Sequence, residues 1–308
     1  MEQALGLMCG AGGLPARMAD EARRRGWRVL AFAFADADIV AHHADRVIPA
    51  RSDTLAPVLA TLQAEGISSV LFSGRFSMSG IIRTDVADTD SLSRGLDERA
   101  GSRIDAALAG TIIATLAGFG IEVLDQRPFF GGALAPAGAW TARAPSGAEW
   151  ADIGRGFAVA RMAADARIGQ TVVVRHGVIT AVEAVEGTSE AIRRGVAHGG
   201  PGAVIVKVVA QEHDYRFDVP AVGLETIEIA IAGGAAVLAV EAGRVVALDR
   251  GALVRAADAA NVALVGVAHG EGGARAAPPG ADGGFGARAA PPGTDGGFGG
   301  RPEPPNSR

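Results

Sequence analysis

The chain has 308 residues, of which 48% are hydrophobic, and it carries a formal net charge of −5. This length is enough for two domains of ordinary size. The mildly acidic balance, without any run of basic residues, excludes the electrostatic pattern of a nucleic-acid-binding protein.

The chain contains a single cysteine, Cys9, so it cannot build an internal disulfide framework. Cys9 lies in an apolar run and is expected to be a small buried hydrophobic residue. The first residues lack the basic and apolar regions of a signal peptide, and no stretch of about 20 apolar residues is present. We therefore expect a soluble, cytoplasmic protein.

The first part of the chain alternates between short apolar strand patterns and amphipathic helix patterns. Strands are expected at residues 4–9, 29–34, 69–73 and 121–124, and helices at residues 14–25, 54–65 and 103–117. Such alternation predicts parallel strands with helical crossovers. We expect a Rossmann-like domain at residues 1–126, followed by a Pro-, Gly- and Ala-rich linker at residues 127–149.

The pattern changes after residue 150 to helices mixed with β-hairpins. One hairpin is expected at residues 171–184 with its turn at His176 and Gly177, and a second at residues 236–248 with its turn at Ala242 and Gly243. Helices are expected at residues 150–167, 189–197, 226–232 and 251–260, and a last strand at residues 262–267. The fold class is therefore α/β, with a mixed catalytic α/β domain at residues 150–269.

The segment at residues 270–308 contains a Gly- and Pro-rich repeat with one Phe per copy. Such a composition buries too little apolar surface to offset the entropy lost on ordering. We expect this tail to be disordered and dispensable for catalysis.

The most informative segment for function is residues 204–226. A β-branched run there ends in a loop that carries Lys207, Asp214, Arg216 and Asp218, and a helix pattern follows. Two cations and two carboxylates beside a helix start suit an anionic ligand together with a divalent metal. A solvated surface loop is the alternative interpretation.

Three motifs give this chain its resemblance to a known family. Gly169-Gln170-Thr171-Val172-Val173 is followed by Ala181-Val182-Glu183-Ala184-Val185-Glu186-Gly187-Thr188, and later by Arg216, Asp218, Pro220, Gly223 and Thr226 in a fixed spacing. Their order resembles that of the UDP-2,3-diacylglucosamine pyrophosphatases of lipid A synthesis, the LpxI type. The resemblance extends over about residues 4–268.

The resemblance implies metal-dependent hydrolysis of the pyrophosphate of UDP-2,3-diacylglucosamine to UMP and 2,3-diacylglucosamine 1-phosphate. It implies that Asp218 is catalytic and binds Mg²⁺ or Mn²⁺, with Glu183 and Glu186 as further metal ligands. Arg216 and Lys207 are expected to clamp phosphoryl oxygens. The matched residues Gly187, Thr188 and Thr226 are expected to bind the substrate or its phosphates.

The glycine turn Gly10-Ala11-Gly12-Gly13 stands between a strand and a helix and is a further candidate phosphate site, with Gly10, Gly12 and Gly13 as its binding residues. Together with Asp36 it leaves open an NAD(P)-dependent oxidoreductase. Pro15 occupies the place of the third glycine of that fingerprint and argues against this alternative. A tight turn without a ligand is equally compatible with the pattern.

The chain departs from the family pattern at several positions, of which Ile104, Ser189 and Met78 each replace a residue of different chemistry. These departures leave open a diverged, non-catalytic protein that binds a UDP-sugar or a lipid precursor. The substrate class further implies transient contact with the inner membrane surface. Acyl-chain specificity, the phosphorus that is attacked and a homodimer stay open.

Overall fold

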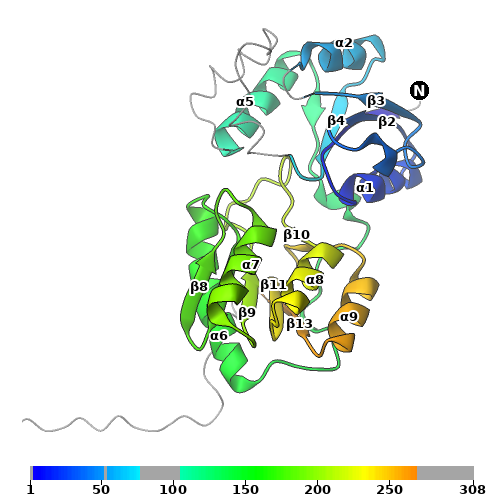
Figure 1. Ribbon diagram of the computed structural model, residues 1–308. Coiled ribbons are helices and arrows are strands. Elements are labelled where there is room, and N and C mark those ends of the chain that lie inside the picture. Colours follow the sequence, from blue (N-terminus) through cyan, green and yellow to red (C-terminus); the bar gives the residue numbers. More distant parts are fainter. Residues whose placement is uncertain (1–2, 52–53, 77–104, 269–308) are drawn as a thin grey trace, which may run out of the picture. The chain divides into compact units, whose positions relative to one another are not determined.

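The computed structural model describes residues 3–51, 54–76 and 105–268 (Figure 1). Several sequence-based expectations concern residues outside these ranges. They are the roles of Met78 and Ile104, the start of the helix expected at residue 103, and the repeat tail.

The N-terminal sheet has five parallel strands in the order β3-β2-β1-β4-β5. Its strands are β1 (Gln3–Cys9), β2 (Trp27–Ala33), β3 (Arg46–Pro49), β4 (Ser69–Ser73) and β5 (Glu122–Val123). The predicted Rossmann-like alternation is confirmed, although β3 was not expected. Its four residues Arg46–Pro49 carry no strong apolar pattern, and pairing with β2 defines the strand.

Helices cover both faces of the N-terminal sheet, as the alternation of side chains along β1 requires. Leu5, Leu7 and Cys9 pack on the side of α1 (Leu14–Arg24), whereas Met8 packs on the side of α2 (Ala56–Ala64). The third helix of this region is α5 (Asp105–Gly118). Burial raises the pKa of the Cys9 thiol to about 12, in line with the expected role of Cys9 as a small apolar residue.

The C-terminal sheet has six strands in the order β6-β13-β11-β9-β7-β8. The three central strands β9, β11 and β13 are parallel, and β6, β7 and β8 pair antiparallel with their neighbours. Their bounds are β6 (Gly138–Ala139), β7 (Thr171–Arg175), β8 (Val178–Val182), β9 (Val204–Lys207), β11 (Val237–Glu241) and β13 (Ala263–Val267). The expected mixed α/β architecture is confirmed.

The two faces of this sheet have different helical covers. Val204 and Val206 of β9 pack toward α6 (Gly147–Asp165), whereas Ile205 lies on the opposite face. That opposite face is covered by α7 (Thr188–Gly199), α8 (Leu224–Ala232) and α9 (Arg250–Ala259) (Figure 1). This layering leaves the carboxyl end of β9 open to the loops that follow β8 and β9.

The first expected hairpin is confirmed and the second is wrong. β7 and β8 pair antiparallel through His176 and Gly177, which have φ of 50° and 75°. After Gly243, however, the chain does not fold back on β11: β12 (Val246–Ala247) pairs in parallel with β10 (Ala221–Val222). The turn-like Ala242-Gly243 is a misleading local signal, because β11 pairs with β9 and β13 on its two sides.

Helix α6 begins at Gly147, three residues before the expected start at residue 150, because a capping box precedes it. The Ser146 side chain accepts a hydrogen bond from Glu149 N–H, and Glu149 accepts one from Ser146 N–H. Within the described ranges, no helix combines the length and apolar character that a bilayer crossing requires.

Candidate active site

Lys207 ends β9 and is buried, with 6% of its surface exposed. Its Nζ donates a hydrogen bond to Thr188 Oγ1 at 2.8 Å. No carboxylate within the described ranges forms an ion pair with Lys207. A buried ammonium that uses one of three donors is costly, and an anionic ligand would offset that cost.

Thr188 links Lys207 to a buried carboxylate. Its hydroxyl accepts from Lys207 and donates to Glu183 Oε1 at 2.8 Å, and Glu183 is only 9% exposed. Gly187 allows this arrangement with φ of 82°, which turns the chain so that Thr188 becomes the first residue of α7. The positive end of the α7 dipole therefore lies beside the lysine, which favours an anion further.

Gln170 connects the same carboxylate to Asp218. Its backbone N–H donates to Glu183 Oε2 at 3.2 Å, and its side-chain Nε2 donates to Asp218 Oδ2 at 3.0 Å. Asp218 is exposed, and its other oxygen, Oδ1, accepts no hydrogen bond from the part of the chain that the structure describes. Gln170 thus fixes one oxygen of Asp218 and leaves the other available to a ligand.

The structure gives Arg216 a different role from the expected phosphate clamp. Its guanidinium forks onto Asp214, with Nη2 2.7 Å from Oδ2 and Nε 3.0 Å from Oδ1. Hydrogen bonds from Arg216 lower the pKa of Asp214, and the same hydrogen bonds raise the pKa of Arg216. This exposed pair shapes the loop between β9 and Asp218, and the structure does not bring Arg216 into the cluster around Lys207.

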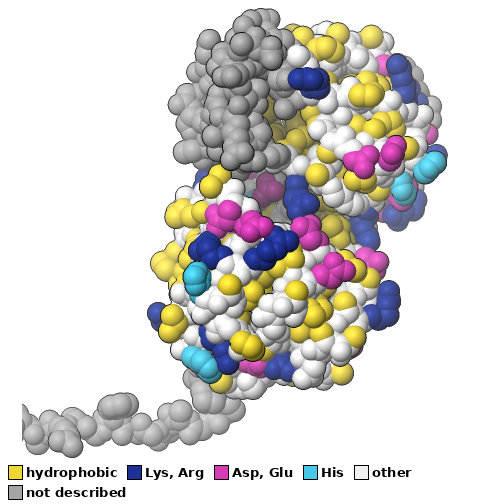
Figure 2. Space-filling model, in the orientation of Figure 1, with side chains coloured by type: hydrophobic (Ala, Val, Ile, Leu, Met, Phe, Trp, Pro, Cys, Tyr) yellow, Lys and Arg dark blue, Asp and Glu magenta, His cyan; other side chains and the backbone are white. Residues whose placement is uncertain are grey.

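Two further candidates also have partners of their own. Glu186 pairs with Arg194 Nη2 at 2.5 Å, and the Thr226 hydroxyl accepts from Gly223 N–H at the start of α8. Thr188 was expected to be a helix cap, but the N-cap position of α7 is Gly187, and the Thr188 hydroxyl serves Glu183 instead. Figure 2 shows other acidic and basic side chains side by side over α7 and α8, including the pair Glu190 and Arg193.

The glycine turn after β1 offers main-chain groups, and most of them are already used. Gly10 N–H donates to Ser73 O at 2.7 Å, and Ala11 N–H donates to Arg75 O at 2.8 Å. Gly10 therefore serves the turn itself, and the prediction of a phosphate contact narrows to the amides of Gly12 and Gly13. Asp36, the acid of the dinucleotide alternative, accepts from Asp38 N–H and caps a short 3₁₀ turn.

The donor set fits a hydrated Mg²⁺ better than a full protein cage. Among the described residues, no three His, Cys, Asp or Glu side chains lie close enough to hold a metal together. Mg²⁺ is commonly held by one or two carboxylates, several waters and substrate phosphates. Asp218 Oδ1 suits that mode, whereas both oxygens of Glu183 already accept hydrogen bonds and Glu186 is paired with Arg194.

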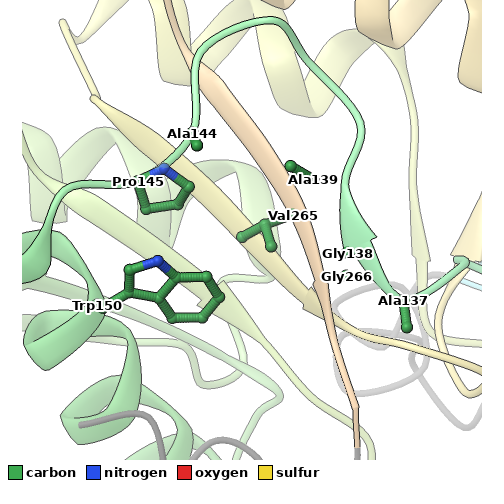
Figure 3. Close-up of a pocket in the computed structure, with 8 residues that line it drawn as sticks. All are labelled: Ala137, Gly138, Ala139, Ala144, Pro145, Trp150, Val265 and Gly266. Atoms are coloured by element: carbon green, nitrogen blue, oxygen red, sulfur yellow. The ribbon is translucent and has the colours of Figure 1, made fainter. Parts of the chain in front are cut away.

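A pocket of about 460 Å³ lies elsewhere, next to the β6–β13 pair at the other side of the C-terminal sheet (Figure 3). Trp150 and Pro145 line it together with Val265. No residue in its lining is ionisable, so we place the chemistry at the carboxyl end of β9 and not in this pocket.

Sequence reasoning missed two signals for this site. Gln170 belongs to a quoted motif but was given no role, although it touches both Glu183 and Asp218. Lys207 is the only lysine of the chain among 29 lysines and arginines. A chain that uses arginine at every other basic position keeps a compact ammonium at this one, where a planar guanidinium is not interchangeable.

The fold and the cluster define a two-sheet α/β protein with a polar site for a phosphorylated ligand in its C-terminal part. The model of the LpxI N-terminal domain matches residues 4–132, and that of the LpxI C-terminal domain matches residues 136–265. The UDP-2,3-diacylglucosamine pyrophosphatase LpxI of Caulobacter vibrioides is 31% identical over 280 residues, which are 85% of this chain and 97% of the relative. The chain belongs to the LpxI family, and the expected class of hydrolase is confirmed.

Proposed function

We propose that this protein hydrolyses the diphosphate of UDP-2,3-diacylglucosamine, giving UMP and 2,3-diacylglucosamine 1-phosphate. The observation that carries the proposal is the buried Lys207 beside the start of α7, within one hydrogen-bonded chain of Asp218. The relative from Caulobacter vibrioides carries the name of this activity and supports the choice of substrate.

The residues divide the chemistry between charge neutralisation and water orientation. Lys207 and the amides at the start of α7 bind phosphoryl oxygens and stabilise the charge that develops on them. Asp218, held by Gln170, orients a water whose oxygen forms the new P–O bond while the anhydride P–O bond breaks. One water is consumed, and the departing phosphate leaves with its product.

A bound Mg²⁺ or Mn²⁺ would neutralise diphosphate charge and lower the pKa of a coordinated water. Asp218 is the residue we assign to hold it, with the substrate's phosphates as the other ligands. Glu183 acts as a support, because it fixes both Gln170 and Thr188.

The substrate class places the protein, on this proposal, in the cytoplasm with transient contact to the inner membrane. Exposed apolar side chains flank the cluster: Ile168 is 54% exposed two residues before Gln170, and Val185 is 70% exposed two residues after Glu183. Both are available to the acyl chains or to the lipid surface.

The test is UMP release from UDP-2,3-diacylglucosamine in mixed micelles by the purified full chain, with Mg²⁺, with Mn²⁺ and with a chelator. We expect release that the chelator abolishes. The absence of UMP in all arms removes the proposal, and release that is indifferent to the chelator removes its metal-dependent part.

A non-catalytic binding protein is the second candidate, and Ser189 favours it. This serine stands where the family pattern has aspartate, and its hydroxyl donates to Glu225 Oε1 at 3.0 Å. Tight binding of the same substrate without UMP release would select this candidate. Restoring the family residue through Ser189→Asp then tests whether the departure is the cause.

A further inference from the structure

A buried ionic network lies behind the loop that carries Asp218. Glu241 ends β11 and has no exposed surface. Its carboxylate accepts from Val209 N–H at 2.9 Å, from Arg161 Nη2 at 2.5 Å and from Arg244 Nη1 at 3.4 Å. These contacts join α6, the end of β11 and the first residues after β9.

Arg244 passes this anchoring on to the loop. Its Nη2 donates to Ala210 O at 2.6 Å and to Gln211 O at 3.1 Å, and its backbone carbonyl accepts from the Tyr215 hydroxyl at 3.0 Å. The loop between Lys207 and Asp218 is therefore fastened at its start and near its middle. His213 Nε2 lies 2.9 Å from Asp218 O and extends the order to the aspartate itself.

We propose that Glu241 is a positioning residue, which acts through Arg244 to hold Asp218 in reach of Gln170. The inference rests on the proposed function, because it assigns a role in that reaction. A buried ion network is rarely more stable than an apolar packing of equal volume, so stability alone does not explain this one. Orientation does, since a misplacement of about 1 Å at a reacting group is enough to cost on the order of 10²-fold in rate.

Glu241→Gln tests the inference against a matched control, Glu149→Gln. Glu149 pairs with Arg143 Nη2 at 2.5 Å, and Arg143 donates to Ala236 O, which directly precedes β11. The two carboxylates thus hold arginines at opposite ends of one strand. We expect Glu241→Gln to lower kcat about tenfold or more with KM nearly unchanged, and Glu149→Gln to leave both within about twofold.

A second readout does not depend on activity. Tyr215 is the only tyrosine of the chain, so fluorotyrosine incorporation gives a single ¹⁹F resonance that reports on this loop. Glu241→Gln should shift or broaden that resonance, and Glu149→Gln should leave it unchanged. If the wild-type protein releases no UMP, the proposed function fails while this comparison still decides whether Glu241 holds the loop.

If Glu241→Gln does not fold, Arg244→Lys replaces it. Lysine keeps the charge beside Glu241 but loses the forked donation to Ala210 and Gln211. We expect a lower kcat, a displaced Tyr215 resonance and a nearly unchanged melting temperature. An unchanged kcat and resonance in the folded variant overturns the inference, as does an equal loss of kcat in Glu149→Gln.

Discussion

The strand ends after β1 and after β9 have the same local plan of strand, turn and helix, but they differ in what they present to a ligand. The turn after β1 offers glycine amides, and two of its N–H groups are already paired with Ser73 and Arg75. The end of β9 carries Lys207 and lies within hydrogen-bonding reach of Thr188, which in turn contacts Glu183. Burial of ionic groups is expensive, so the comparison places the chemistry in the C-terminal part and leaves the glycine turn with a role in shape.

The largest expected effect separates Asp218 from every acid of the N-terminal sheet. Asp218→Asn should lower kcat by about 10²-fold or more while substrate binding persists, because an amide is a poorer cation ligand and cannot accept a proton. UMP release measures turnover, and calorimetry with the product sugar phosphate measures binding.

Asp214→Asn is the matched control for that variant, since Asp214 lies in the same loop and pairs with Arg216. Its kcat should stay close to wild type. Normal turnover in Asp218→Asn would move the chemistry to Glu183 or Glu186.

Lys207→Met addresses the cation of the cluster. We expect kcat/KM to fall about 10- to 100-fold because a phosphoryl oxygen loses a charge-assisted hydrogen bond. The melting temperature should stay the same or rise, since an apolar side chain of similar length replaces a buried charge. A purely structural lysine would give the opposite result, with lower stability and unchanged turnover.

Lys207→Arg sharpens the same point. It keeps the charge, but the guanidinium is larger and planar and does not fit the place of a buried ammonium. We expect it to restore little of the activity, and full activity in this variant would show that charge alone is needed.

Most of the fold follows from local pattern, and the errors have physical causes. The parallel sheet around β1 is predictable because its strands alternate with helices of ordinary length. The second hairpin was wrong because Ala242-Gly243 resembles a turn, whereas the partners of β11 are distant in sequence. No local signal encodes such a pairing.

The site was predictable as a set of residues but not as a set of contacts. Lys207, Thr188, Glu183 and Asp218 come together as their motifs suggested. That Arg216 turns to Asp214 follows from side-chain geometry within the loop, which spacing does not encode. The sole lysine was the signal that composition could have given.

A smaller effect is expected when the glycine turn is changed, and it should fall on stability. A Cβ at position 10 would lie 2.5 Å from Arg75 O, so Gly10→Ala should lower the free energy of unfolding by about 1–3 kcal/mol. At Gly13 nothing lies within 4 Å of such an atom, and Gly13→Ala should stay within about 0.5 kcal/mol. Urea unfolding measures both, and kcat should be nearly unchanged in the folded variants; a large loss of kcat would give the turn a role in chemistry.

The smallest effect is expected at Glu186, the acid that the structure takes out of the metal set. Burial raises the pKa of Glu186, but hydrogen bonds from its own backbone and from Arg194 outweigh burial and leave the pKa below its ordinary value. The native state therefore binds fewer protons here than the unfolded state, so the contribution to stability is present above about pH 4.3 and is lost as the pH falls through the native pKa. Because the pair with Arg194 is largely solvated, Glu186→Gln should cost only about 0.2–1 kcal/mol at pH 7, and less at high salt or near pH 3. Urea unfolding of both proteins at the two pH values checks this, and turnover of the variant should remain within about twofold of wild type; a loss comparable to that of Asp218→Asn would return Glu186 to the active site.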